Sequence, residues 1–483
     1  MTRHAAAIEL AHRVLPATPF ATLDDYVAAG GGAGLRRALD DEPAALVDCI
    51  TESGLRGRGG AGFPTGTKWR TVADFASDTL PTTVVVNGAE GEPGTFKDRA
   101  ILRYNPYAVL EGAVIAARAV GAPSVVVAVK ETFTRERDRV RDAILEFEAA
   151  GLVDRGVISV VAGPREYLYG EETALLEVVA GRPPFPRLAP PWRRGTIEAV
   201  ESVEDAASDS GLPASVSMAG TTEAPPSLVN NVETLANVPG IVARGPDWFR
   251  SAGTDESPGT VVCTVSGSTT RAGVGEIPMG TPLRDAISSI GGGVPGGRRI
   301  AAVLMGVANA ALSGDQLDTP MSYEGMRSAG SGLGSAGALV FADDIDLTAV
   351  AAGVARFLAV ESCGQCTPCK QDGLAIASGL RSGARVDGYL ATVTDEARCA
   401  LAAQQQTVVS SLLALAGKRP NDVAPFLIAE LIDIDQDGHA IYDETFVEKQ
   451  PDWTYDDIDS GQTPVDRLTD KRDDSRTPAD RRL

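Results

Sequence analysis

Four cysteines in the last third of the chain have the spacing of ligands for an iron–sulfur cluster. Cys363, Cys366 and Cys369 follow one another at three-residue intervals, and Cys399 comes thirty residues later. Four thiolates converging on one volume suit a 4Fe–4S cluster, which requires soft ligands. A structural zinc site is the alternative, but zinc sites more often use two separated cysteine pairs. The spacing therefore predicts a 4Fe–4S cluster on these four residues.

A glycine-rich segment near the N-terminus could bind a phosphate group. Residues 54–69 read GLRGRGGAGFPTGTKW. Glycines allow backbone N–H groups to approach an anion closely, and Arg58 and Lys68 would add positive charge. Taken alone, the segment is equally well interpreted as a structural turn.

Three further segments carry polar groups suited to ligand binding. Residues 87–99 (NGAEGEPGTFKDR) follow a β-branched run, and carboxylates at the carboxyl end of a parallel strand can hold ribose hydroxyls. The other two segments are residues 167–175 (YLYGEETAL) and 230–235 (NNVETL), whose paired asparagines could bind the edge of a flavin ring. Individually, the first segment could be a turn with solvated acids, and the others could be helix caps.

The patterns around these segments predict the elements that position them. Short β-branched runs at 84–86, 125–129 and 157–161 alternate with helical patterns at 108–120 and 135–149, which is typical of βαβ units on a parallel sheet. Short strands separated by glycine-rich turns then predict a small mixed domain. Helical spacing on both sides of the cysteines predicts a bundle around the cluster.

These patterns divide the chain into five parts. They are a helical lead-in at 1–50, an α/β domain at 51–250 with an acidic insertion at 193–224, a small mixed domain at 251–335, the cluster bundle at 336–430, and an acidic, partly disordered tail at 431–483.

Composition excludes several classes of protein. At 483 residues the chain is long enough for several domains with substantial cores. With 44 basic against 65 acidic residues, a net charge of -21 and no basic stripe, it is not expected to bind nucleic acid or insert into a membrane. Arg3, Glu9 and Arg13 interrupt any signal-peptide core, and the clustered cysteines indicate a reducing compartment, so a cytoplasmic location is expected.

Taken in order, the five motifs resemble those of one known family. The glycine-rich loop, residues 87–99, the Gly-Glu-Glu-Thr and Asn-Asn-Val-Glu-Thr segments and the four cysteines occur as in the flavoprotein (51 kDa) subunit of NADH:quinone oxidoreductase (complex I). Related diaphorase subunits of NAD-linked formate dehydrogenases and hydrogenases share them, and the resemblance covers roughly residues 50–450. It implies an α/β fold with a Rossmann-like FMN-binding domain, a β-grasp (soluble-ligand-binding) domain and a helical bundle that carries the 4Fe–4S cluster.

The resemblance also implies which residues bind the cofactors. Those expected to line the FMN site are Gly57, Arg58, Gly60, Lys68, Asn87, Glu92, Tyr167, Gly170, Glu171, Asn230, Asn231 and Thr234. Phe63, Glu90 and Glu172 are expected to face the nicotinamide cofactor. Ala89, Thr71 and Ala189 depart from the family, which usually has aspartate, an aromatic and a basic residue at these positions.

The implied function is electron input to a larger complex. NADH would be oxidised by FMN without a catalytic side chain, and electrons would pass singly to the cluster and on to partner subunits. The expected partners are a small 2Fe–2S thioredoxin-like subunit and a larger iron–sulfur or catalytic subunit. One alternative is the same module run in reverse, reducing NAD(P)⁺ in a formate dehydrogenase or hydrogenase. The other is a non-catalytic Fe–S scaffold that lacks flavin.

A calcium loop is a further possibility near the C-terminus. Asp433, Asp435, Asp437, Gly438 and Glu444 fit the spacing of an EF-hand loop. Ala440 occupies a position that is usually aliphatic and larger, and residues 449–451 make a poor exit helix, so an acidic turn is the preferred interpretation.

Overall fold

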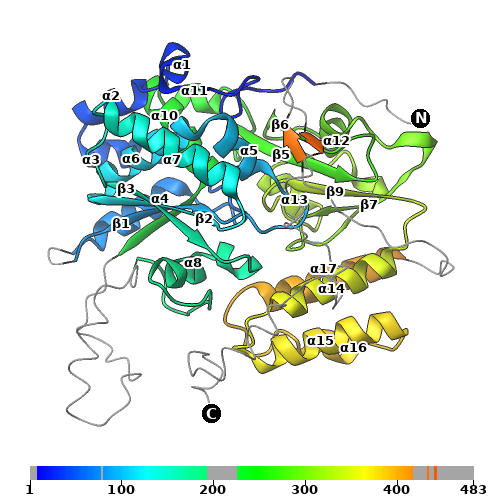
Figure 1. Cartoon of the computed structure of the whole chain (residues 1–483). Helices are drawn as coiled ribbons and strands as arrows, with labels where there is room; N and C mark the ends of the chain where they lie inside the picture. Colours follow the sequence, from blue (N-terminus) through cyan, green and yellow to red (C-terminus); the bar gives the residue numbers. More distant parts are fainter. Residues whose placement is uncertain (1–7, 78–79, 193–225, 417–431, 435–439, 443–483) are drawn as a thin grey trace, which may run out of the picture.

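The computed structural model describes residues 8–77, 80–192 and 226–416, together with two short strands beyond them. The described chain forms a parallel sheet covered by helices, a second, mixed sheet, and a helical bundle (Figure 1). The predicted insertion at 193–224 and most of the tail, including residues 435–439 and 443–444 of the possible calcium loop, lie outside the described residues.

The first sheet is fully parallel and has the strand order β3-β2-β1-β4. Its strands are β1 (Thr83–Gly88), β2 (Ser124–Lys130), β3 (Ile158–Gly163) and β4 (Ser227–Asn231). The chain moves from β1 outward to β3 and then returns to place β4 on the other side of β1. The strand order therefore reverses at β1, and ligands of open α/β sheets bind beyond the carboxyl ends of the strands at such a point.

Helices cover both faces of this sheet, which explains why its strands are rich in valine. Most pack on one face, and α8 (Glu172–Val179) with the 3₁₀ turn η1 (Tyr167–Gly170) lies on the other (Figure 1). The larger group comprises α2 (Ala33–Asp40), α3 (Pro43–Ser53), α4 (Thr65–Asp74), α5 (Lys97–Tyr104), α6 (Pro106–Val120), α7 (Thr134–Ala149), α10 (Val232–Arg244) and α11 (Pro246–Arg250).

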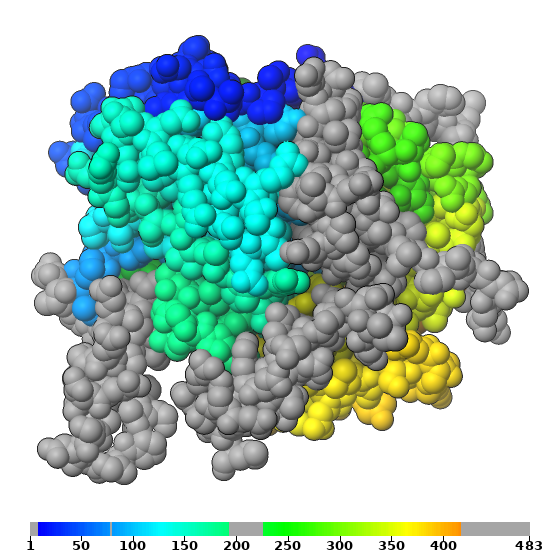
Figure 2. All heavy atoms as spheres, in the orientation of Figure 1, coloured from blue at the N-terminus to red at the C-terminus, as the bar shows by residue number. Residues whose placement is uncertain are grey.

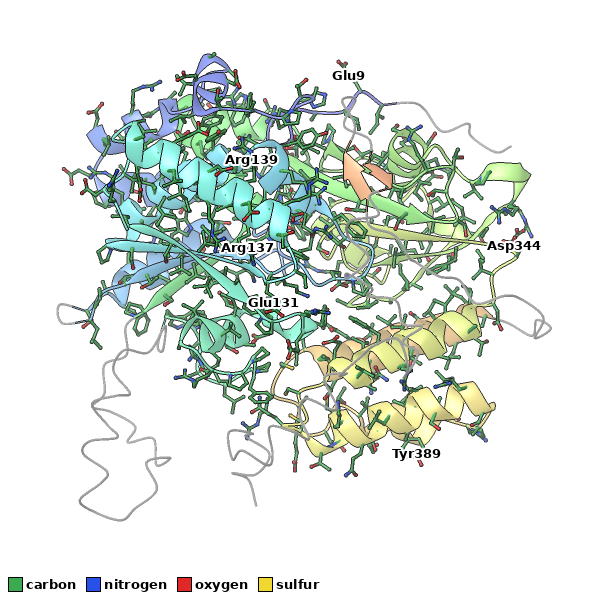
Figure 3. All side chains as sticks on the ribbon, viewed as in Figure 1. Glu9, Glu131, Arg137, Arg139, Asp344 and Tyr389 are labelled. Carbon is green, nitrogen blue, oxygen red and sulfur yellow. The ribbon has the colours of Figure 1, made fainter. Side chains whose placement is uncertain are left out.

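The N-terminal part of the chain is held against this helical layer. Arg139 of α7 (Figure 3) places its guanidinium 4.9 Å from the ring centre of Tyr107 and donates to the Phe20 carbonyl. Thr22 is the N-cap of helix α1 (Leu23–Ala28), and its side chain accepts a hydrogen bond from the backbone N–H of Asp25. The lead-in therefore contains the predicted helices, and it is packed as part of the first unit.

The second sheet is mixed and has the order β6-β5-β9-β7-β8. Its strands are β5 (Thr260–Gly267), β6 (Gly273–Pro278), β7 (Ile300–Met305), β8 (Leu312–Ser313) and β9 (Gly337–Ala342), with helices α12 (Leu283–Gly291) and α13 (Tyr323–Ser328) and the turns η2 (Pro295–Gly297) and η3 (Gly314–Gln316). Strand β9 lies beyond the predicted boundary at residue 335. It pairs with β5 and β7 at the centre of the sheet, so this unit extends at least to residue 342.

An N-terminal strap joins the two sheets. Ala11 forms an antiparallel bridge with Glu276 on the edge strand β6. The carboxylate of Glu276 accepts hydrogen bonds from the backbone N–H groups of Val14 at 2.9 Å and Leu15 at 3.0 Å. Burial of this carboxylate is compatible with folding because backbone donors on the strap satisfy it.

The bundle comprises α14 (Leu347–Glu361), α15 (Thr367–Ser382), α16 (Asp387–Thr392) and α17 (Leu401–Ala416). Leu358, Ile376 and Val408 are among its fully buried side chains, and they come from three different helices. Figure 2 shows the bundle in yellow at the lower right of this face. Two remaining strands, β10 (Ile432–Ile434) and β11 (Ala440–Tyr442), form an antiparallel pair. In the described ranges, no helix is long and apolar enough to cross a membrane.

A candidate cofactor cavity and a four-cysteine site

A cavity of about 510 Å³ lies where the three units meet. The first unit contributes the glycine-rich loop, the segment after β1, the turn η1 and the end of β4. Loops of the second unit contribute Asn309 and Ser335, and the bundle contributes Cys399 and the first part of α17 as far as Thr407. The cavity lies at the carboxyl ends of β1 and β4, as expected from the reversal of strand order.

The structure brings eight of the predicted cofactor residues together around this cavity. These are Gly60, Asn87, Glu90, Glu92, Tyr167, Gly170, Glu171 and Asn231. The other seven, which do not line it, are Gly57, Arg58, Phe63, Lys68, Glu172, Asn230 and Thr234.

The glycine-rich loop is shaped by contacts on its far side. The Gly57 N–H donates to the Phe63 carbonyl at 2.8 Å, and the Tyr323 hydroxyl donates to the Gly57 carbonyl at 2.8 Å. Gly60 has a φ of 136°, which L side chains rarely adopt, and an added Cβ there would meet nothing within 4 Å. The loop therefore presents open backbone to the cavity, which suits the approach of a phosphate.

Arg58 has a different place from the one expected. Its side chain is buried, and Nη2 donates to the carbonyls of Pro258 at 3.1 Å and Thr260 at 3.0 Å. Its backbone N–H donates to Thr234 Oγ1 at 2.8 Å. A buried guanidinium needs acceptors, and these carbonyls supply them, so Arg58 and Thr234 fix the loop from behind.

Lys68 and Asn230 are also turned toward protein partners. Lys68 pairs with Glu172 and donates to the Val229 carbonyl at 2.8 Å. Asn230 Oδ1 accepts a hydrogen bond from the indole N–H of Trp69 at 2.8 Å. Phe63, by contrast, is 52% exposed, which leaves its ring available beside the glycine-rich loop.

Two carboxylates follow β1, and each has defined partners. Glu90 accepts hydrogen bonds from the backbone N–H groups of Asp98 at 3.2 Å and Arg99 at 3.4 Å, at the start of α5. Glu92 accepts from the Tyr167 hydroxyl at 2.7 Å and from the Val307 N–H at 2.5 Å. Glu92 therefore links the first sheet to the second at the edge of the cavity.

Tyr167 adds a contact with the bundle. Its hydroxyl lies 3.3 Å from Gln404 Oε1 on α17, and its backbone N–H donates to Glu361 at 2.8 Å. Burial, together with the charge and hydrogen bond of Glu92, raises the pKa of Tyr167 well above its ordinary value. The phenol therefore stays protonated at neutral pH and acts there as a hydrogen-bond donor.

The remaining polar residues of the cavity are held by their own segments. Asn87 Nδ2 donates to the Gly170 carbonyl at 2.9 Å, and its Oδ1 accepts from the Ala89 N–H at 3.2 Å. Glu171 is the N-cap of α8, where it accepts from the N–H groups of Thr173 and Ala174. These contacts join η1 to the end of β1 and reduce the freedom of the cavity wall.

The four cysteines surround a second, smaller pocket next to the cavity. All are free thiols, and Gln365 Nε2 lies 3.5 Å from Cys363 Sγ while donating to the Pro186 carbonyl at 2.8 Å. Burial raises the pKa of Cys369 to about 11 and that of Cys399 to about 12, and the neighbouring cysteines add to both increases. A bound metal centre would reverse these increases in pKa because it holds its thiol ligands deprotonated.

The donor set fits an iron–sulfur cluster. In the described part of the chain, no three histidine, cysteine or carboxylate side chains converge closely enough to hold one metal ion. Four thiols around one shared pocket are the soft donor set that a 4Fe–4S cluster requires.

The cavity and the cysteine pocket share part of their walls. Leu168, Cys399 and Leu401 line both. Cys399 lies two residues before the start of α17, and Leu168 lies in η1 between Tyr167 and Gly170. A group in the cavity and a cluster on the cysteines would therefore be separated by little more than these side chains.

Several residues of the site were not singled out from the sequence. Asp98 lines the cavity and Lys97 lies directly behind it. Both belong to the segment 87–99, but neither was among the residues expected to bind a cofactor. Asn309, Ser335 and Gln404 come from distant segments. The run of glutamines at 404–406 in an otherwise apolar helix was the available signal for Gln404.

Known proteins are similar to this chain over about 72% of its length. The family model described as the Nuo51 FMN-binding domain matches residues 50–240. The NADH-quinone oxidoreductase F 2 protein of Rhizobium meliloti (strain 1021) is 38% identical over 359 residues, covering 72% of this chain and 79% of that protein. The F protein of the same enzyme from Streptomyces coelicolor is 38% identical over 358 residues, covering 72% of this chain and 74% of that protein.

Hydrogenase proteins are also similar. The NADP-reducing hydrogenase subunit HndC of Solidesulfovibrio fructosivorans is 35% identical over 365 residues, covering 72% of this chain and 68% of that protein. A chain in the crystal structure of an NAD⁺-reducing [NiFe]-hydrogenase in the H₂-reduced state matches with a TM-score of 0.69 and 29% identity, covering 86% of this chain and 69% of that one. These findings confirm the expected α/β fold, and the chain belongs to the family of 51 kDa flavoprotein subunits of NADH-quinone oxidoreductase and its hydrogenase relatives.

Proposed function

We propose that this chain is the electron-input flavoprotein of a multisubunit oxidoreductase. It binds FMN in the cavity, takes electrons from NADH there, and delivers them singly to a 4Fe–4S cluster on Cys363, Cys366, Cys369 and Cys399. The observation that carries the proposal is the wall shared by the cavity and the cysteine pocket at Leu168, Cys399 and Leu401. Membership of the FMN-binding family and the all-sulfur donor set support it.

The chain's own residues bind and orient the cofactor. The open backbone at Gly60 suits the phosphate, and the amides of Asn87 and Asn231 suit the polar edge of the ring. The protonated Tyr167 hydroxyl and Glu92 hold the wall nearest the cluster. Bound FMN supplies the exchange between two-electron and one-electron chemistry, so no side chain has to act as an acid or base.

We assign the nicotinamide nucleotide to the outer side of the glycine-rich loop. The exposed ring of Phe63 suits stacking on a base, and the pair of Lys68 and Glu172 lies close to the same loop. Glu90 lines the cavity and accepts hydrogen bonds from the start of α5, and we assign it to the nicotinamide end.

The chain works with partner subunits, since its relatives are named as subunits of larger enzymes. We propose a small 2Fe–2S thioredoxin-like subunit and a larger iron–sulfur or catalytic subunit as these partners. The reducing cytoplasm suits the six free cysteines.

Similarity to hydrogenase proteins named for NADP and NAD⁺ reduction favours a second candidate, the same module run in reverse.

Cofactor analysis of the anaerobically purified chain tests the proposal. We expect about one FMN and about four irons per chain, with bleaching of the flavin absorbance on addition of NADH or NADPH. Comparing the two nucleotides gives the cofactor preference. Iron without flavin, or a flavin that neither nucleotide reduces, would support the scaffold alternative and contradict this proposal.

A further inference from the structure

Lys97 is a buried cation directly behind the cofactor cavity. Its side chain is fully buried at the start of α5, and Nζ lies 2.7 Å from Asp98 Oδ1, 3.0 Å from Glu233 Oε2 and 3.1 Å from Asn231 Oδ1. The ammonium donates hydrogen bonds to Asp98 and Asn231, and Glu233 Oε2 lies at ion-pair distance. Lys97 is fully buried and does not line the cavity, so it influences the cavity through these partners.

The charge of Lys97 is maintained despite its burial. Burial by itself lowers the pKa of a lysine, but Asp98 and Glu233 overcome this and raise the pKa of Lys97 above its ordinary value. Lys97 is thus an ammonium, and only a donor, throughout the neutral range.

Two of these residues hold the side-chain amide of Asn231. Asn231 Nδ2 donates to Asp98 Oδ2 at 2.7 Å, and its Oδ1 accepts from Lys97 and from the Glu233 N–H at 3.0 Å. Lys97 can only donate hydrogen bonds, and the Asp98 carboxylate can only accept them. In a flipped amide the NH₂ group would face the Lys97 ammonium and the amide oxygen would face the Asp98 carboxylate, so neither hydrogen bond could form. The amide thus has one permitted orientation.

This orientation determines what the cavity wall offers at Asn231. Oδ1 already accepts two hydrogen bonds, and Nδ2 uses one of its two hydrogens on Asp98. The group that remains for a ligand is the second N–H of Nδ2. Asn231 lines the cavity, so the wall presents a donor there and not an acceptor.

We propose that Lys97 and Asp98 form a buried clamp that fixes Asn231 as a hydrogen-bond donor to an acceptor atom of the bound flavin. Lys97 is then a positioning residue that never touches the cofactor. This inference rests on the proposed binding of FMN in the cavity. The inference adds to that proposal that Asn231 donates to the flavin, and that Lys97 and Asp98 fix the orientation of its amide.

A double-mutant cycle in the full chain tests the clamp. Lys97→Met, Asn231→Ala and the double variant are stripped of FMN, and the dissociation constant of added FMN is measured from the quenching of its fluorescence. Loss of one oriented hydrogen bond predicts that Lys97→Met weakens FMN binding by about tenfold when Asn231 is present. In the Asn231→Ala background the same change should have less than about a twofold effect, because the clamp has nothing left to orient.

A second readout separates orientation from stability. The visible absorbance bands of the bound flavin should shift in Lys97→Met when Asn231 is present and should not shift further in the Asn231→Ala background. An equal loss of affinity in both backgrounds would overturn the proposal, since Lys97 would then act through general stability. A wild-type chain that binds no FMN would instead contradict the proposed function itself.

Two further variants keep the test decisive. If Lys97→Met fails to fold, Asp98→Asn leaves the pairing of Lys97 with Glu233 in place but lets the Asn231 amide flip. It should lose FMN affinity with Asn231 present and not in the Asn231→Ala background. Arg103→Met is the matched control. Arg103 Nε lies 2.9 Å from a carboxylate oxygen of the buried Glu136, and neither residue lines the cavity. Its FMN affinity should stay within about twofold of wild type.

Discussion

At the scale of single residues, Lys130 at the end of β2 should make stability depend on pH. Its Nζ donates to the Arg165 carbonyl at 2.7 Å, and burial lowers the pKa of Lys130 to about 8, although Glu361 and Glu166 act in the opposite direction. Between this value and the ordinary pKa of lysine, the unfolded chain binds more protons than the folded chain. Stability should therefore rise with pH through that window, by about 1–3 kcal/mol.

Chemical denaturation at pH 7.5 and at about pH 10 would measure this increase. Lys130→Met removes the titrating group, so its free energy of unfolding should lack the increase seen in the wild type. The same rise in both proteins would show that another group is responsible.

The cysteines give a second prediction at this scale. Cys399→Ser should lose the cluster, because a hydroxyl is a poor ligand for iron and only three thiols remain. Iron per chain and the broad absorbance of the cluster measure the loss. Cys263→Ser is the matched control, since Cys263 is buried in β5 away from the cysteine pocket. Retention of full iron content by Cys399→Ser would remove Cys399 from the ligand set.

Residues whose placement follows from local sequence were the easiest to predict. Asn87 and Asn231 meet because each lies at the carboxyl end of its strand, and the two strands are neighbours in the same parallel sheet. Arg58 was expected to face a phosphate, but its partners are carbonyls about 200 residues away, at Pro258 and Thr260. Charge and motif could not show which way this side chain points, since that depends on how the second sheet docks.

At the scale of elements, the crossing of α6 and α10 depends on Gly112. A Cβ added to Gly112 would lie 2.0 Å from the Leu235 carbonyl oxygen, which belongs to backbone and cannot move aside cheaply. Gly112→Ala should therefore lower the free energy of unfolding by about 1–3 kcal/mol, measured by denaturant titration. Asn231 caps α10, so this crossing also supports the cavity.

Gly388 in α16 provides the matched control for this substitution. It is helical, and an added Cβ would meet nothing within 4 Å. Gly388→Ala should stabilise the protein by about 0.5–1 kcal/mol because alanine loses less conformational entropy in a helix. Equal effects of the two substitutions would show that the close approach at Leu235 is not limiting.

The order of strands could be predicted less well than the strands themselves. The β-branched runs predicted β1, β2 and β3 close to their observed positions because the signal is local. Strand β9 lies between β5 and β7. Its pairing with β5 joins residues that are more than 70 positions apart in the sequence. No local pattern records such pairing, so the expected domain boundary stopped short of this strand.

At the scale of the whole molecule, the three units are joined around the cavity by Tyr167. Its hydroxyl donates to Glu92, which also accepts from Val307 of the second unit, and it lies beside Gln404 of the bundle. The Tyr167 ring packs edge-on against Phe357 of α14 with centroids 5.4 Å apart. The cofactor cavity and the cysteine pocket therefore depend on one junction for their relative placement.

Replacing Tyr167 with phenylalanine should loosen this junction while preserving the ring contact. Glu92 would lose its tyrosine donor, and we expect a loss of about 1–2 kcal/mol in the free energy of unfolding. Hydrogen exchange should rise at the start of α17 and around residues 306–309, because these segments would be held less firmly to the first unit. Tyr169→Phe is the matched control, since its hydroxyl lies 3.5 Å from the Val129 carbonyl inside the first unit. It should leave exchange in α17 unchanged, and equal exchange in the two variants would show that the Tyr167 hydroxyl does not couple the bundle to the cavity.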